Sequence, residues 1–223
     1  MNLSNDTISI LKNFSDINQN ILVKPGSKLQ TISTLKNILA EANIKESFDQ
    51  EFAIYDLTEF LRAVELFDSP TFKFNGGSNM MIADEKTKQR VKYFFADKSV
   101  IVAPTKTINM PDKHVSFTLK KNLFEKFKKG STTLNRPDVA IIGDGKTISM
   151  VATDKKDKSA NDYSIEVGES DKKFTAYFKA ENFKQIVDDY DVAISKQKIS
   201  HFINRTKPIQ YWIALEPDSK ISK

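Results

Sequence analysis

Residues 119–130 read LKKNLFEKFKKG and combine an apolar repeat with a cluster of lysines. Leu119, Leu123 and Phe127 recur at every fourth position with Phe124 beside them, which predicts a helix with one apolar stripe. Five lysines fall largely outside that stripe: Lys120, Lys121, Lys126, Lys128 and Lys129. A lysine-rich helix face is usually only solvated. A phosphate-facing role gains weight here because four helices of similar design are predicted at similar intervals along the chain.

The composition is that of a globular protein with a real core. Of 223 residues, 39% are hydrophobic and 28% charged, with 7 Gly and 7 Pro, which allows one large domain or two smaller ones. The absence of cysteine excludes a disulfide framework, a thiolate metal site and a thiol nucleophile. No apolar run is long enough for a membrane span and the N-terminus lacks signal-peptide character, so we expect a soluble intracellular protein.

The positive charge is unevenly distributed. The net charge is +5, yet residues 1–110 carry 13 basic and 13 acidic side chains, so the whole excess lies in the second half. Such a bias is compatible with a polyanionic partner near that half without requiring one.

The other three predicted helices have apolar stripes and start signals of the same kind. A first helix begins after Ser4 and buries Ile10, Phe14 and Ile17, and a second, 57–67, opens with a capping box formed by Asp56 and Glu59. A fourth is expected over 180–187. Alternating or turn-bounded segments predict strands between them, at 20–24, 29–33, 37–44, 52–55, 71–74, 80–83, 91–96, 115–119, 139–142, 147–153, 163–167, 174–178, 191–195, 199–204 and 210–215.

Short helices separated by sets of strands predict an α+β fold. Residues 99–112, SVIVAPTKTINMPD, have a proline near each end and little periodicity, which indicates a linker between domains at 1–98 and 113–223. The two halves also echo each other, since Tyr55-x4-Phe60-x3-Val64 matches Phe178-x4-Phe183-x3-Val187. The tail EPDSKISK is expected to be loose.

No catalytic constellation emerges. His114 and His201 are far apart and neither has a carboxylate or serine in a known arrangement. Asp188 and Asp189 are neighbours that diverge on a helix, so a solvated helix end is the better interpretation than a metal site. The stretch 143–147, GDGKT, lacks the first glycine of a phosphate-binding loop and joins two strands, which indicates a hairpin turn.

Four landmarks carry a family resemblance: LSNDTISILKNFSDIN, FAIYDLTEFL, SVIVAPTKTINMP and WIALEPDS, in this order along nearly the whole chain. In them the chain resembles the sliding clamps, or DNA polymerase processivity factors, of T-even-like bacteriophages. The resemblance implies two similarly folded α+β domains per subunit, each with two short helices packed on antiparallel sheets. It further implies a ring of three subunits that encircles duplex DNA and tethers the replicative polymerase.

The resemblance also suggests site residues. The helix cations expected to face DNA are Lys12, Arg62, Lys120, Lys121, Lys126, Lys128, Lys129 and Lys184. A partner-peptide pocket beside the linker would use Val102, Ile108, Met110, Tyr211, Ile213, Leu215 and Pro217. Strand 91–96 of one subunit would meet strand 163–167 of the next, with contacts at Tyr93, Phe95, Tyr163 and Ile165.

The implied partners are duplex DNA read without sequence preference, a replicative polymerase, a clamp-loader ATPase and late-transcription factors, in the cytoplasm of the infected bacterial host. No cofactor, metal, membrane or enzymatic activity is implied. The chain departs from the family in being basic overall, where many such clamps are acidic. Two alternatives remain open: a single-stranded DNA-binding protein, which needs exposed aromatics beside a basic groove, and a phage structural ring protein.

Overall fold

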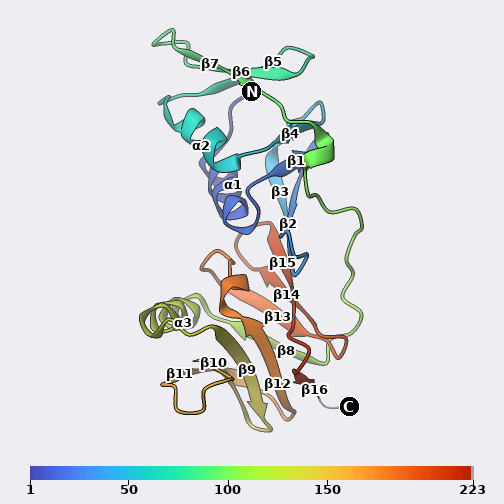
Figure 1. Ribbon diagram of the computed structural model, residues 1–223, viewed down its shortest axis with the longest axis vertical. Helices are drawn as coiled ribbons and strands as arrows, with labels where there is room; N and C mark the ends of the chain where they lie inside the picture. Colours follow the sequence, from blue (N-terminus) through green and yellow to red (C-terminus); the bar gives the residue numbers. More distant parts are fainter. Residues whose placement is uncertain (222–223) are drawn as a thin grey trace. The chain divides into compact units, whose positions relative to one another are not determined.

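The computed structural model describes residues 1–221 and divides the chain into two compact units, residues 1–106 and 107–223 (Figure 1). The division falls inside the predicted linker, most of which has no regular structure. No helix within residues 1–221 is long and apolar enough to cross a bilayer.

The first unit places two helices beside three groups of antiparallel strands. Its helices are α1 (Asn5–Ile17) and α2 (Leu57–Glu65), which lie side by side (Figure 1). Its strands are β1 (Ile21–Val23), β2 (Gly26–Ile32), β3 (Ile38–Phe48), β4 (Phe52–Ile54), β5 (Thr71–Phe74), β6 (Asn79–Ala83) and β7 (Arg90–Phe94), followed by a 3-10 turn, η1 (Lys98–Val100). β1 pairs with β4, β2 with β3, and β5, β6 and β7 form a meander with β7 at its edge.

Local signals decide both helices of this unit. The Ser4 hydroxyl accepts the Thr7 backbone N–H at 3.3 Å, and the Asp56 carboxylate accepts that of Glu59 at 2.9 Å, so each side chain satisfies an orphan donor of the first turn. The predicted stripes are buried, with Phe14 and Leu57 at 0% exposure. The prediction of these two helices is confirmed.

The second unit packs one long helix against strands. β8 (Val115–Leu119) leads into α3 (Lys121–Leu134), which contacts β10 and β11 (Figure 1). The remaining elements are β9 (Asp138–Asp144), β10 (Thr147–Thr153), β11 (Tyr163–Glu169), β12 (Lys173–Lys179), η2 (Ala180–Asn182), β13 (Tyr190–Ile194), β14 (Ile199–Asn204), β15 (Ile209–Ala214) and β16 (Lys220–Ile221). One sheet has the order β11-β10-β9-β12-β16, and in another β15, β14, β13 and β8 are successive neighbours.

The prediction of a fourth helix at 180–187 is wrong. Only the 3-10 turn η2 forms there, and the chain then runs to β13 without regular structure. Two tyrosine side chains bond the backbone of Ile186, whose N–H a helix would direct to the Asn182 carbonyl. The Tyr190 hydroxyl donates to the Ile186 carbonyl at 2.7 Å, and the Tyr211 hydroxyl accepts the Ile186 N–H at 3.4 Å. The described residues therefore contain three α-helices, two of them in the first unit, and the sequence echo at Phe183 marks no second helix.

Helix α3 continues past Gly130, where the sequence placed its end. A Cβ at Gly130 would lie 2.5 Å from Cδ1 of Tyr163, so the ring of Tyr163 packs where any other side chain would begin. Glycine lowers helix propensity, but here it allows the close approach of β11. The helix ends at Leu134, and the C-cap residue Asn135 adopts the left-handed conformation with φ 49°.

The tail is not loose, which corrects the prediction for residues 216–221. Glu216 donates its N–H to the Tyr177 carbonyl at 2.8 Å, and Lys155 forms ion pairs with Glu216 at 3.5 Å and Asp218 at 2.9 Å. β16 then pairs with β12. The last two residues of the predicted tail, 222 and 223, lie outside the described residues.

Candidate nucleic-acid interface

Helix α3 presents a cationic face to solvent. Its exposed positions are Lys121, Asn122, Glu125, Lys126, Lys129, Thr132 and Thr133, with exposed Lys120 at the N-cap. The opposite side is anchored by Phe124 and Phe127, which are 0% and 1% exposed. Three lysines against one carboxylate on an amphipathic helix suit contacts to a phosphate backbone.

A segment distant in sequence fixes the first turn of α3. Lys120 gives no side-chain cap, and the Asp189 carboxylate instead accepts the Lys121 backbone N–H at 2.6 Å. A carboxylate at a helix N-terminus satisfies an orphan donor and complements the helix dipole. This capping residue was missed, because nothing local to residues 119–130 points to it.

Lys128 is also committed within the protein. Its Nζ donates to the Gln185 carbonyl at 2.7 Å and lies 5.1 Å from the centre of the Phe124 ring. The side chain is half-buried, unlike those of Lys126 and Lys129. Lys128 therefore fastens α3 to the segment 183–189, and its role as a DNA-facing cation stays a prediction that its half-buried position does not favour.

The pair Asp188 and Asp189 is not a solvated helix end. Asp188 is 7% exposed and accepts hydrogen bonds from the Thr206 hydroxyl and from the Asp189 N–H. Burial acts to raise the pKa of Asp188, but these hydrogen bonds outweigh it, so its pKa lies below the usual value. The carboxylate thus stays charged while it holds the turn that presents Asp189 to α3.

Replacing Asp189 with alanine is expected to lower the free energy of unfolding by about 0.5–2 kcal/mol, because the first turn of α3 loses its cap. Asp189→Asn keeps a capping oxygen and should recover most of the loss. Urea unfolding monitored by circular dichroism measures both. Equal losses in the two variants would show that Asp189 acts through its charge rather than through the cap.

The cations of the first unit lie among carboxylates. Lys12 on α1 pairs with Glu65 on α2 at 2.5 Å, and both side chains are about half exposed. Arg62 is exposed on α2, one turn from Glu59 and one turn from Glu65. Lys184 is half-buried in the irregular segment after η2, so its placement on a helix is wrong.

The strands predicted to meet between subunits are both sheet edges. β7 ends the β5-β6-β7 meander and β11 ends its five-stranded sheet. The four predicted contact residues are half-buried within their own unit: Tyr93 packs on Phe60 with ring centres 5.2 Å apart, and Tyr163 on Phe127 at 6.4 Å. Burial beside Glu59 and Asp56 raises the pKa of Tyr93 to about 12, which keeps its hydroxyl neutral. Contact with a second copy stays a prediction.

The partner-pocket residues fall into two groups. Tyr211 and Ile213 have 0% exposure and Leu215 has 7%, so these three are core residues rather than an open lining. Val102, in the first unit, and Ile108 and Met110, in the second, are half-buried, and Pro217 is exposed. The pocket remains a prediction, and only Val102, Ile108, Met110 and Pro217 have surface that a peptide could contact.

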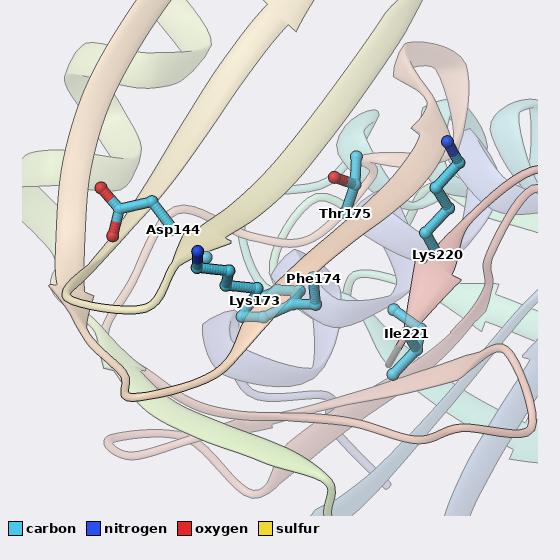
Figure 2. A pocket seen from close by; sticks show the side chains of 7 residues that line it. Asp144, Lys173, Phe174, Thr175, Lys220 and Ile221 are labelled. Carbon is cyan, nitrogen blue, oxygen red and sulfur yellow. The ribbon is translucent and has the colours of Figure 1, made fainter. Parts of the chain in front are cut away.

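A cavity in the second unit does not supply chemistry. Figure 2 shows it at the ends of β9, β12 and β16, with Asp144 and Lys173 on paired strands and Lys220 across from them. The lining has one carboxylate and two amines but no nucleophile held by a base. The Asp144 carboxylate accepts the N–H groups of Lys146 and Thr147, each at 2.8 Å, which confirms 143–147 as a hairpin turn.

The histidines also have structural surroundings. His201 stacks on Trp212 with ring centres 4.5 Å apart, and its Nε2 lies 2.9 Å from the Gln210 side-chain oxygen. Burial lowers the pKa of His114, and the charges of Lys172 and Lys196 lower it further. Among residues 1–221 no group of three acidic or histidine side chains is placed to hold a metal ion.

Two family models match the chain in succession. Residues 4–103 match a model described as DNA polymerase processivity factor, and residues 116–217 match the C-terminal model of the gp45 sliding clamp. The sliding clamp of Vibrio phage KVP40 is 36% identical, covering 97% of this chain and 99% of that protein. The sliding clamp of Enterobacteria phage T4 is 30% identical, covering 98% of each.

The fold has solved counterparts at low sequence identity. The proliferating cellular nuclear antigen of Entamoeba histolytica superposes with a TM-score of 0.70 at 14% identity, over 94% of each chain. At this identity the likeness shows a shared two-unit fold.

Proposed function

The chain belongs to the sliding-clamp family of DNA polymerase processivity factors, and on that premise we propose that three copies close head to tail around duplex DNA and hold the replicative polymerase on it. The observation that carries the proposal is the cationic face of α3, fixed by Asp189 and Lys128 on a fold of this family. Lysines make screened, sequence-independent contacts to phosphates that exchange readily, which suits a protein that must slide. Tethering raises the local concentration of polymerase at the primer end, so the clamp needs no chemistry of its own.

Ring closure would use the two free sheet edges. Phe95 donates its N–H to the Ser78 carbonyl at 2.8 Å, so the odd-numbered residues of β7 bond to β6 and the backbone groups of Lys92 and Phe94 point to the open edge. β11 of the next copy can complete this ladder. On one face of the joined sheet Tyr93 and Phe95 would then adjoin Tyr163 and Ile165, as the family resemblance implies.

The charges on the exposed faces of β7 and β11 also favour pairing of β7 with β11 of the next copy. The exposed face of β7 carries Arg90 and Lys92, and that of β11 carries Ser164 and Glu166. Opposite charges on facing strands stabilise a pair and disfavour the pairing of an edge with itself. Two β7 edges would repel each other, which selects a head-to-tail ring.

Partners other than DNA would dock beside the linker, where Ile108, Met110 and Pro217 offer apolar surface for a short peptide. A closed ring needs a clamp-loader ATPase to open it, and the family likeness supports a further role in late phage transcription. The clamp loader and the role in late transcription are both inferred from the family alone.

The decisive test is retention on nicked circular duplex compared with the same DNA after linearisation, with a clamp-loader ATPase and ATP present to open the ring. Retention on circles and loss on linear DNA, together with a particle mass of three times 25.3 kDa, are expected. A single-stranded DNA-binding protein would bind both equally. Within residues 1–221 the exposed aromatic side chains are Tyr55 and Phe94, neither of them on the unit that carries α3, which leaves no stacking track beside the cationic face. A structural ring protein would close but would not stimulate polymerase.

A further inference from the structure

Each of the three helices has its own balance of exposed charge. On α1 the exposed charged residues are Asp6, Lys12 and Asp16, and on α2 they are Glu59, Arg62 and Glu65. Each of these helices therefore presents two carboxylates for one cation. Helix α3 reverses the ratio, with Lys121, Lys126 and Lys129 against Glu125.

The cations of the first unit are also neutralised locally. Lys12 is held by Glu65 at 2.5 Å and lies one turn from Asp16, so a phosphate would have to compete with two carboxylates. Arg62 lies between Glu59 and Glu65 on the same helix and contributes to the low pKa of Asp56, which the Glu59 backbone N–H lowers most. A cation with such neighbours releases few counterions when a phosphate approaches.

The cations of α3 are less neutralised in the described part of the chain, although Lys121 and Lys129 each lie one turn from Glu125 and the charge of Lys121 contributes to the low pKa of Asp188. None of the ion pairs within residues 1–221 includes Lys121, Lys126 or Lys129, and Glu125 is the single exposed carboxylate of the helix. Lys126 and Lys129 are three residues apart and therefore adjacent on the helix surface. Because α3 is capped by Asp189 and fastened through Lys128, this face is presented by a rigid element.

We propose that the duplex is contacted through α3 alone, and that the helices of the first unit form a weakly repulsive wall that carries no phosphate contacts. This inference rests on the proposed function and departs from a lumen that is basic throughout. In a ring of three copies it leaves three cationic tracks separated by acidic helices. DNA would then touch the protein at few points, which keeps the attraction weak enough for sliding while topology retains the clamp.

The test compares two matched double variants that each remove two cations. Lys126→Gln with Lys129→Gln alters α3, and Lys12→Gln with Arg62→Gln alters the first unit. Affinity for a fluorescein-labelled duplex is measured by anisotropy between about 50 and 200 mM salt. The α3 variant should bind more weakly, and the slope of log K against log salt should fall in magnitude by about 0.9 for each phosphate that is no longer neutralised. The first-unit variant should keep the slope of the unaltered protein.

A complementary variant should gain affinity. Asp16→Asn with Glu59→Gln removes two carboxylates from the proposed wall, and tighter binding at low salt is expected. The inference would be overturned if the α3 variant and the first-unit variant changed the slope equally. It would also be overturned if removal of the two carboxylates left the affinity unchanged. The particle mass and the preference of the unaltered protein for circular DNA, recorded alongside, report on the proposed function separately, since a ring that prefers circles can still fail the slope comparison.

Discussion

Replacing Lys92 with proline is expected to convert the ring to single subunits. The Lys92 N–H points to the open edge of β7, away from β6, so proline removes a donor that only a second copy would use. Proline is tolerated on edge strands, and the β5-β6-β7 meander should persist. The mass in solution should fall to that of one 25.3 kDa chain, and stimulation of processive synthesis should fall on the order of 100-fold because tethering is lost.

The matched control is Lys92→Gln, which removes the same charge but keeps the backbone N–H. It also removes the contact of the Lys92 Nζ with the Phe94 ring, whose centre is 4.8 Å away. It should remain trimeric at low salt. A proline variant that is folded by circular dichroism and still runs as a trimer would place the subunit interface elsewhere.

Reversing three charges on α3 is the second change with a large expected effect. Lys121→Glu, Lys126→Glu and Lys129→Glu together should reduce polymerase stimulation on circular templates by roughly tenfold or more, since attraction to phosphate becomes repulsion along the whole exposed face. These side chains are exposed and take part in none of the ion pairs described above, so the fold and the trimer should survive. Primer-extension product length with saturating polymerase is the measurement.

Net charge changes equally in a control with Lys24→Glu, Lys156→Glu and Lys158→Glu, all exposed positions outside the helices. That variant should retain stimulation if the position of charge matters rather than its total. Similar losses in both would indicate long-range attraction by the whole basic chain, and α3 would lose its special role.

The elements that could be predicted are those decided by neighbouring residues. Ser4 and Asp56 each accept a hydrogen bond from the backbone N–H three residues further on, at the start of the helix that follows. The spacing of apolar residues predicts which face of α1 and of α2 is buried, and the structure buries those faces. Strand alternation succeeded for the same reason. The family likeness added ring closure and partners, which no local pattern contains.

The failures share one cause, which is that the deciding interactions come from elsewhere in the chain. Residues 180–187 have helical spacing, yet the hydroxyl of Tyr211, 25 residues further along the chain, accepts the backbone N–H of Ile186. Lys128 looks like any other lysine of its helix until the Gln185 carbonyl is placed beside it. The tail has no periodicity, and Lys155 holds it by charge.

The cap that Asp189 supplies has a consequence for the order in which the protein folds during synthesis. Asp189 is 68 residues beyond Lys121, so α3 emerges from the ribosome long before its first turn can be completed. A helix of 14 residues is marginal in water by itself. The second unit should therefore acquire protected amides in α3 only after β13 has been made, with nascent α3 open to proteolysis until then.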